Sequence, residues 1–308
     1  MAHIFCTKTI INSSFELLRK NGHTLEVWDD KNNGPISSEI LIKKASGAQA
    51  MISMLSDKID KAFLDQCPKL KIISQYAVGT NNIDLIECEK RGIKVFNTPD
   101  VLTDASAELG FALLLACARR IIPATENAKN GNWQGWEPMG FLGKSLKGLK
   151  LGIVGPGKIG QEFARLCASA FSMEVSYFGP SEKEGFDAQK VDLETLLRES
   201  DIVSLHCPLN DQTRNLIGQK ELKMLKSDTI LINTSRGEVI EQNALIEVLR
   251  MGHLHSVGLD VTTPEPLDRN HALYQFDNVV ITPHIASATY KARIDMANLV
   301  CENINNFL

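Results

Sequence analysis

Four charged residues in the second half of the chain stand at equivalent places. Arg236, Asp260, Glu265 and His284 each follow closely on a short apolar run that has the length of a buried strand. Ligands of open α/β sheets bind beyond the carboxyl ends of the strands. We therefore expect these four side chains to converge on one site.

The residue types suit the reduction of a 2-oxo acid. Such a reaction needs a cation for the substrate carboxylate, an acid that protonates the carbonyl oxygen, and a hydride donor. Arg236 offers a planar fork that stays charged, and His284 can give or take a proton near neutral pH. A carboxylate behind that histidine would orient the ring. The hydride would come from a nicotinamide cofactor.

A glycine-rich segment is the candidate cofactor site. Residues 155–160 read GPGKIG, follow the apolar run 151–154 and open a stretch with helical spacing. Gly155 permits the tight turn, Gly157 lets the backbone approach a pyrophosphate, and Gly160 lets helix and strand pack closely. Free N–H groups at the helix start would bind the phosphates. This context indicates a dinucleotide-binding motif.

The choice between the two nicotinamide cofactors depends on the end of the next strand. An acidic residue about 20 residues after the motif usually binds the adenosine ribose. Residues 178–181 (FGPS) contain no carboxylate. A 2′-phosphate would therefore not be repelled near Gly179, and Ser181 and Lys183 would be able to contact it. The sequence predicts NADP or NAD as cofactor, with a slight preference for NADP.

The elements that must position these residues are short strands alternating with helices. Before residue 99 we predict strands at 3–7, 24–28, 50–54, 71–76 and 94–96, and helices at 13–20, 38–46, 61–66 and 85–91. After residue 149 we predict strands at 151–154, 175–178, 202–205, 229–233, 256–261 and 279–282, and helices at 159–170, 193–199, 219–225 and 242–251. This alternation indicates parallel sheets with helices on both faces.

The remaining segments connect these patterns. A long apolar helix is predicted at about 103–120, and Pro123 should bend or end it. An irregular loop is expected at 131–148, and a last helix at 291–307 is expected to return to the first domain. The result is an α/β protein of two Rossmann-like, doubly wound domains with a cleft between them. A flavodoxin-like substrate domain would comprise 1–98 and 288–308, and a dinucleotide-binding domain would comprise 99–287.

Composition argues against several other classes of protein. The net charge of −4 and the scattering of the basic residues give no footprint for nucleic acid. The longest apolar run, 111–118, is too short to span a bilayer, and the first residues do not resemble a signal peptide. The seven cysteines show no C-x-x-C spacing and are expected to be reduced, without a metal site. We therefore predict a cytoplasmic enzyme with neither nucleic-acid nor membrane partners.

A set of short motifs runs through the chain. It comprises 78–84 (VGTNNID), 98–104 (TPDVLTD), 155–160 (GPGKIG), 206–208 (HCP), 235–237 (SRG), 258–261 (GLDV), 265–266 (EP) and 283–284 (PH). Together these motifs resemble the D-isomer-specific 2-hydroxyacid dehydrogenase family over essentially the whole chain. Residues 55–57, 133–138 and 262–267 look most like its glyoxylate/hydroxypyruvate reductases. The resemblance implies reduction of glyoxylate or hydroxypyruvate by NAD(P)H, and a homodimer.

The resemblance also implies roles for single residues. Arg236 would bind the substrate carboxylate and carbonyl, His284 would be the proton donor, and Glu265 would pair with His284. Further substrate contacts would be Leu55, Val78, Gly79 and Trp136. The cofactor contacts would be Gly155, Gly157, Lys158, Ile159, Gly160, Gly179, Ser181, Cys207, Pro208, Thr213, Thr234, Ser235, Arg236, Asp260, His284 and Ser287. Trp136 would either pack its own loop or form a pocket wall in a neighbouring subunit.

Two positions depart from the family pattern. Pro156 stands where an aliphatic residue is common, which should not affect phosphate binding. Gly179 stands where many NAD-dependent members carry Asp, which puts the choice of cofactor in doubt.

Two other functions share parts of the pattern. A D-3-phosphoglycerate dehydrogenase would need extra cations for the substrate phosphate, and the loop 136–139 (WEPM) offers none. A dinucleotide-sensing, corepressor-like binding module would have the same fold, which by itself does not distinguish it from an enzyme. Turnover of a panel of 2-oxo acids would separate these functions.

Overall fold

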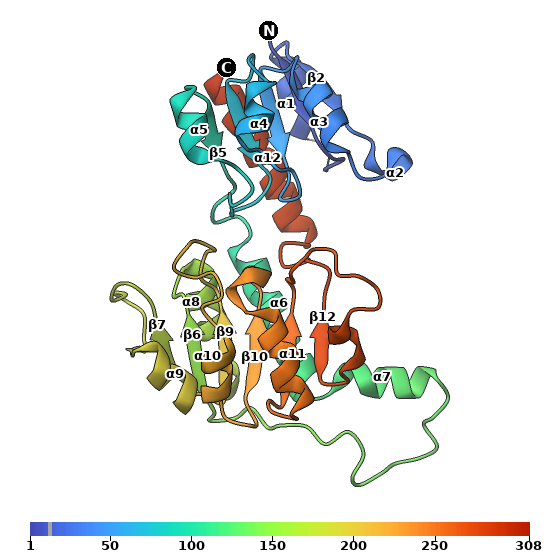
Figure 1. Ribbon diagram of the computed structural model, residues 1–308, viewed down its shortest axis with the longest axis vertical. Coiled ribbons are helices and arrows are strands. Elements are labelled where there is room, and N and C mark those ends of the chain that lie inside the picture. Colours follow the sequence, from blue (N-terminus) through green and yellow to red (C-terminus); the bar gives the residue numbers. More distant parts are fainter. Residues whose placement is uncertain (12–13) are drawn as a thin grey trace. The chain divides into compact units, whose positions relative to one another are not determined.

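The computed structural model describes residues 1–11 and 14–308 of the chain. These residues divide into two compact units, Met1–Leu102 with Ser287–Leu308, and Thr103–Ala286 (Figure 1). We call them the N-terminal unit and the C-terminal unit. Each is an α/β structure built on a parallel sheet, which confirms the predicted fold class.

The N-terminal unit contains a five-stranded sheet in the order β2-β1-β3-β4-β5. This is the strand order of flavodoxin-like folds. Every residue of β3 and β4 is buried, as expected of parallel strands with helices on both faces. The strands are β1 (His3–Cys6), β2 (Thr24–Val27), β3 (Ala50–Ser53), β4 (Ile72–Gln75) and β5 (Lys94–Phe96).

The described residues of this unit also form helices. They are α1 (Phe15–Lys20), α2 (Asp30–Asn33), α3 (Ser38–Ala45), α4 (Lys61–Asp65), α5 (Leu85–Lys90) and α12 (Tyr290–Phe307). The predicted start of the first helix, Ser13, lies outside the described residues. The last helix, α12, packs against β4 and α1, and the Tyr76 hydroxyl donates a hydrogen bond to the Arg293 carbonyl at 2.7 Å. The end of the chain therefore belongs to the N-terminal unit.

The C-terminal unit contains a seven-stranded parallel sheet in the order β12-β11-β10-β9-β6-β7-β8. The order reverses between β6 and β9, which is the switch point at which dinucleotide-binding sheets hold their ligand. The short edge strand β8 was not predicted. The strands are β6 (Lys150–Val154), β7 (Glu174–Phe178), β8 (Gln189–Lys190), β9 (Ile202–Leu205), β10 (Ile230–Asn233), β11 (Ser256–Leu259) and β12 (Val279–Ile281).

Helices cover both faces of this second sheet (Figure 1). One apolar cluster joins α6 and α8 to one face, and another joins α9, α10 and α11 to the other. The helices of the unit are α6 (Thr103–Ala118), α7 (Ile121–Lys129), α8 (Lys158–Phe171), α9 (Leu193–Glu199), α10 (Gln219–Met224) and α11 (Gln242–Arg250), with short 3-10 helices at Gly237–Val239 and Ala272–Gln275.

The long helix ends close to the predicted position, but it is followed by a second helix that was not predicted. Helix α6 ends at Ala118, and a second helix, α7, begins at Ile121. The break falls at Arg120, which has a left-handed φ of 50°. Pro123 lies in the first turn of α7, where a missing N–H costs no intrahelical hydrogen bond.

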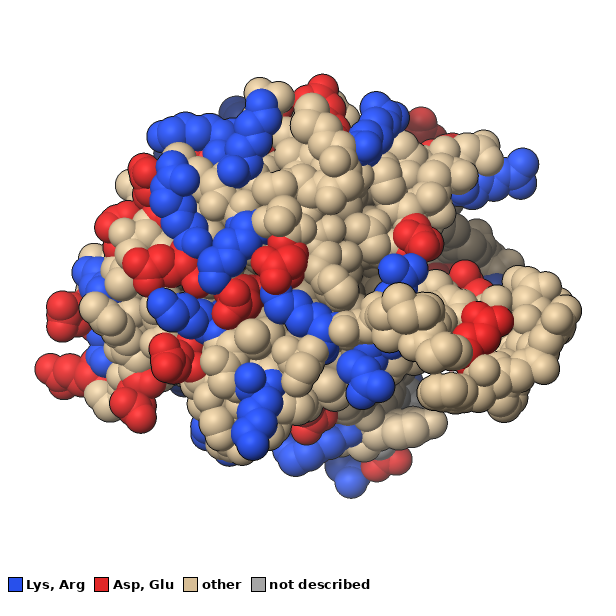
Figure 2. Space-filling model, turned by 90° about the horizontal axis from the view of Figure 1, so that it is seen from below, with Lys and Arg blue, Asp and Glu red and all other residues tan. Residues whose placement is uncertain are grey.

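The charges on the surface are mixed. Figure 2 shows one face of the molecule on which Lys and Arg are interspersed with Asp and Glu. Opposite charges therefore neutralise one another locally, in keeping with the small net charge of −4. Within the ranges 1–11 and 14–308, no helix combines the length and the apolar character that crossing a membrane requires.

Candidate active site

Glu265 and His284 form a hydrogen-bonded pair in the C-terminal unit. The Nδ1 atom of His284 lies 2.7 Å from Oε2 of Glu265, while Oε1 of Glu265 accepts the N–H of Thr262 at 3.1 Å. Glu265 belongs to the loop after β11, and His284 to the loop after β12. With Nδ1 held by the carboxylate, Nε2 is the ring nitrogen that remains for proton exchange with a ligand.

Glu265 is ionised in this arrangement. Burial acts to raise its pKa, but the hydrogen bond and charge of His284, with the charge of Arg236, bring the pKa of Glu265 below its ordinary value. An ionised carboxylate keeps the proton on Nδ1 and fixes the orientation of the imidazole ring. The pair therefore has the arrangement of a histidine acid–base group with a carboxylate behind it.

Asp260 holds the backbone around His284. His284 has a left-handed φ of 53°, and its N–H donates to the Asp260 carbonyl at 3.0 Å. The carboxylate of Asp260 is buried and accepts hydrogen bonds from Thr282 Oγ1 (2.6 Å) and from the N–H groups of Ile285 and Ala286 (2.8 Å each). Both carboxylate oxygens are thus engaged with the segment that carries His284. Sequence reasoning placed Asp260 at the cofactor and missed this positioning role.

Arg236 lies in a turn after β10 that Asn233 shapes. The Asn233 side chain donates to the Arg236 carbonyl at 2.9 Å and accepts the N–H and hydroxyl of Ser235 at 3.0 and 2.8 Å. A Cβ atom at Gly237 would lie 2.1 Å from the Thr262 carbonyl oxygen. Only glycine therefore lets this turn lie against the segment that leads to the glutamate of the pair.

Burial also affects Arg236. Burial lowers the pKa of Arg236, and the charges of Glu265 and Glu238 act in the opposite direction. A guanidinium group nevertheless keeps its charge, because its ordinary pKa lies far above neutral pH. The loops after β10, β11 and β12 thus combine a partly buried cation with a glutamate–histidine pair. Such a set can bind the carboxylate of a small acid and exchange a proton with it.

The glycine-rich segment has the geometry that a dinucleotide requires. Gly155 has a φ of 92°, and a Cβ there would lie 2.5 Å from the Cys207 nitrogen. A Cβ at Gly160 would lie 2.6 Å from the Gly155 carbonyl oxygen, whereas a Cβ at Gly157 would have no neighbour within 4 Å. Helix α8 begins at Lys158, directly after this open side. A pyrophosphate therefore fits next to the N–H groups of the helix start.

The two residues that depart from the family pattern, Pro156 and Gly179, are in contact with each other. A Cβ atom at Gly179 would lie 2.7 Å from Cδ of Pro156, and a proline ring cannot rotate away. The presence of Pro156 thus requires glycine at 179. The loop that follows is held by a hydrogen bond from the Lys183 N–H to the Tyr177 hydroxyl at 2.9 Å. Pro156 therefore restricts the position at which we predict the ribose contact, and the sequence motifs did not reveal this coupling.

Other predicted cofactor contacts lie at the carboxyl ends of β9 and β10. Thr213 Oγ1 donates to the Pro208 carbonyl at 2.6 Å. The Thr234 hydroxyl oxygen is buried and has no hydrogen-bond partner in the described part of the chain. His206 Nε2 lies 2.8 Å from Ser204 Oγ, and burial lowers the pKa of His206 to about 4. The lowered pKa favours the neutral imidazole, which shares a hydrogen bond with Ser204.

Comparison with known proteins identifies the family. The model of the D-isomer specific 2-hydroxyacid dehydrogenase NAD-binding domain matches residues 111–286. A glyoxylate reductase from Thermococcus litoralis is 47% identical, over 99% of this chain and 93% of the relative. The chain belongs to the D-isomer specific 2-hydroxyacid dehydrogenase family. As a member of that family it is an oxidoreductase.

Solved structures give the same assignment. A crystal structure of a protein from Thermus thermophilus has a TM-score of 0.93 and 41% identity, with 98% of this chain and 96% of that chain covered. An NADPH-dependent glyoxylate/hydroxypyruvate reductase from Sinorhizobium meliloti, in complex with NADP and malonate, has a TM-score of 0.86 and 27% identity, with 99% and 93% covered. A nicotinamide dinucleotide is therefore the cofactor of this dehydrogenase.

Several predicted site residues of the dehydrogenase lie apart from the loops after β10, β11 and β12. Leu55, Val78, Gly79 and Ser287 belong to the N-terminal unit. Trp136 lies in the irregular segment after α7 and is 88% exposed. The contacts that the family resemblance implies for these five residues remain predictions. In residues 1–11 and 14–308, no cluster of His, Cys, Asp and Glu is arranged to hold a metal ion.

Proposed function

We propose that this dehydrogenase reduces glyoxylate and hydroxypyruvate to the corresponding 2-hydroxy acids with NAD(P)H. The 2.7 Å hydrogen bond between Glu265 and His284, with the charge of the partly buried Arg236 acting on Glu265, is the observation that carries the proposal. The names of the Thermococcus litoralis and Sinorhizobium meliloti relatives support this choice of substrates.

The catalytic roles follow from the chemistry of the three side chains. Arg236 binds the substrate carboxylate and polarises the carbonyl group. His284 gives a proton from Nε2 to the carbonyl oxygen while Glu265 holds Nδ1. The bound nicotinamide supplies the hydride to the 2-carbon. Leu55, Val78, Gly79 and Trp136 complete the substrate contacts.

The remaining predicted residues hold the cofactor. Gly155, Gly157, Lys158, Ile159 and Gly160 would bind the pyrophosphate, in a loop whose open side leaves room for it. Cys207, Pro208 and Thr213 would line the adenosine side. Thr234, whose hydroxyl is buried without a partner in the described residues, would contact the nicotinamide region with Ser235, Asp260 and Ser287.

Initial rates of NADPH and NADH oxidation with glyoxylate, hydroxypyruvate, pyruvate and 3-phosphohydroxypyruvate test this function. Fast turnover of the first two acids is the expected result. A preference for the phosphorylated acid would instead indicate a phosphoglycerate dehydrogenase. Tight cofactor binding without turnover of any of these acids would favour a dinucleotide sensor.

NADP is the proposed preferred cofactor, and the contact between Pro156 and Gly179 gives a test. We expect Gly179→Asp alone to weaken binding of both dinucleotides, because the new side chain would collide with the proline ring. Pro156→Ala with Gly179→Asp removes that collision and places a carboxylate at the ribose, so the ratio of the two Kd values should shift toward NADH by at least about tenfold. Fluorescence titration of NADPH and NADH measures both constants without substrate.

Pro156→Ala alone is the matched control for this cofactor experiment. It should leave the preference for NADPH unchanged, because it adds no carboxylate. An unaltered ratio of Kd values in the double variant would show that Gly179 does not determine the choice of cofactor. A strong preference of the unchanged protein for NADH would overturn the NADP assignment.

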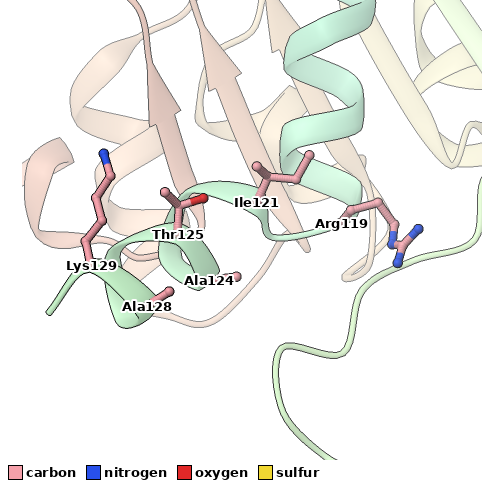
Figure 3. Close-up of a pocket in the computed structure, with 6 residues that line it drawn as sticks. All are labelled: Arg119, Ile121, Ala124, Thr125, Ala128 and Lys129. Carbon is pink, nitrogen blue, oxygen red and sulfur yellow. The ribbon is translucent and has the colours of Figure 1, made fainter. Parts of the chain in front are cut away.

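A homodimer is proposed through α7 and the segment that follows it. A groove of about 560 Å³ runs along α7, and Figure 3 shows Arg119 and Lys129 near its opposite ends with Ile121, Ala124, Thr125 and Ala128 between them. Beyond α7, Trp133, Trp136 and Met139 are 73%, 88% and 77% exposed. Apolar side chains exposed in such number usually mark an interface, and the family resemblance indicates a second copy of this chain as the partner.

Charges placed on α7 should therefore prevent dimer formation. We expect the unchanged protein to have twice the mass of one chain by light scattering, and Ile121→Asp with Ile122→Asp to give the mass of a single chain, because buried unpaired carboxylates are strongly destabilising. Ile86→Asp, at a 69% exposed position of α5, is the matched control and should stay dimeric. A monomeric unchanged protein at micromolar concentration would contradict the proposal.

A cytoplasmic location is proposed as well. All seven cysteines lie in the described residues, and each is buried and free. Thiols without disulfides are typical of proteins in reducing compartments.

A further inference from the structure

The N-terminal unit contains connected polar side chains beneath the two loops that are proposed to contact the substrate. The first loop, 54–58, follows β3 and carries Leu55, and the second, 76–82, follows β4 and carries Val78 and Gly79. Four of the polar side chains are at most 2% exposed: Thr7, Ser53, Asp57 and Gln75. Burying polar groups costs free energy unless each is hydrogen-bonded, so the partners of these groups show what the cluster does.

Asn82 links the two loops. Its Nδ2 atom donates to the Met54 carbonyl at 3.0 Å and to the Asp57 carbonyl at 2.7 Å, and both acceptors belong to the first loop. Its Oδ1 atom accepts from Gln75 Nε2 at 2.8 Å, and its own carbonyl accepts the N–H of Ile59 at 2.8 Å. A single side chain of the second loop thus holds the carbonyl groups at both ends of a tight turn in the first.

Gln75 and Ser53 connect this link to the sheet. Besides its bond to Asn82, Gln75 Nε2 donates to the Gly79 carbonyl at 3.3 Å, and Gln75 Oε1 accepts the Ser53 hydroxyl at 2.5 Å. Ser53 and Gln75 are opposite each other in the paired strands β3 and β4. The peptide at Gly79 is therefore anchored to the last residues of two buried strands.

Asp57 closes the first loop. Its Oδ2 atom accepts the N–H of Met54 at 2.7 Å and the hydroxyl of Thr7, which follows β1, at 2.5 Å. The backbone N–H of Asp57 donates to the Met54 carbonyl at 3.0 Å. The turn is thereby tied to a third strand, and its shape does not depend on exposed side chains.

We propose that Asp57, Gln75 and Asn82 are positioning residues that fix the two loops in the shape that binds the substrate carboxylate. The inference rests on the proposed function, in which Leu55, Val78 and Gly79 contact the substrate. The bonds of Asn82 and Gln75 to the loops go to main-chain carbonyl groups, so they set the direction of the neighbouring peptides. Peptide N–H groups bind a carboxylate only when they are held in the right direction, and small displacements reduce turnover strongly.

Asn82→Ala is the decisive variant. We expect its KM for glyoxylate to rise by about tenfold or more, with a smaller change in kcat, because a loosened loop weakens substrate binding before it affects hydride transfer. The Kd for NADPH, measured by fluorescence without substrate, should stay within about twofold, because the glycine-rich loop belongs to the other unit. A lower unfolding temperature with an unchanged KM would show that the network is structural only, and would overturn the proposal.

A matched pair of serine variants decides the question even if Asn82→Ala does not fold. Ser53 and Ser74 lie on adjacent paired strands, and both are fully buried. Ser53 bonds to Gln75, whereas Ser74 bonds to Asn303 of α12 at 3.4 Å. Ser53→Ala should raise the KM for glyoxylate and Ser74→Ala should not, so equal effects of the two variants would contradict the proposal. Absence of turnover in the unchanged protein would be seen first, and would overturn the proposed function together with this inference.

Discussion

Arg236→Ala is expected to lower kcat/KM for glyoxylate by about 1,000-fold or more, which corresponds to roughly 4 kcal/mol, because the substrate carboxylate loses the charged, two-bonded contact of the guanidinium group. Alanine would leave the substrate carboxylate without its cation. It would also remove from Glu265 a charge that helps to lower its pKa. Initial rates over a range of glyoxylate concentrations, with saturating NADPH, measure the effect.

Two further variants show whether this loss comes from the fork of the guanidinium group. Arg236→Lys keeps the charge but cannot form two parallel hydrogen bonds, so its kcat/KM should fall between those of Arg236→Ala and the unchanged protein. Arg198→Ala is the control, because Arg198 is exposed and pairs with Glu194 within α9. It should behave like the unchanged protein. Near-normal kinetics of Arg236→Ala would remove this residue from the active site.

The sequence predicted the strands and helices well because the strands are buried. The apolar run at 202–205 coincides with β9, which is buried throughout, and most other elements differ by one or two residues at their ends. The two-residue strand β8 has only exposed residues and no apolar pattern that distinguishes it from a loop. Helix α7 was missed because a proline signals the end of one helix and does not show that the next helix begins around it.

The polar side chains at strand ends were predictable for a different reason. Parallel strands deliver their carboxyl ends to one edge, so Arg236, Glu265 and His284 were expected together before any coordinates were known. The direction of each side chain was not predictable. Asp260 also lies at the end of a strand, but its carboxylate accepts hydrogen bonds from the segment that carries His284. Its direction therefore suits positioning of that segment.

The sequence motifs did not reveal contacts between residues that are far apart in the sequence. Pro156 and Gly179 were noted separately, and only the folded chain shows that one restricts the other. The connection from Gln75 through Asn82 to Asp57 joins two loops through side chains whose types alone suggest ordinary turns. Such couplings depend on register and backbone direction, which local composition does not encode.

His284→Gln is expected to lower kcat by about 100- to 10,000-fold, the range of positioned acid–base catalysis, while NADPH still binds. Glutamine can bond to Glu265 but cannot deliver a proton.

Since Glu265 acts through His284, Glu265→Gln should have little further effect on kcat in the His284→Gln background, although it lowers kcat in the unchanged protein. His253→Gln is the control. His253 lies between α11 and β11, outside the loops that carry Arg236, Glu265 and His284, and its Nε2 atom lies 2.8 Å from the Leu225 carbonyl oxygen. Fully additive losses would mean that the two residues act independently, and an unchanged kcat in His284→Gln would exclude this histidine as the proton donor.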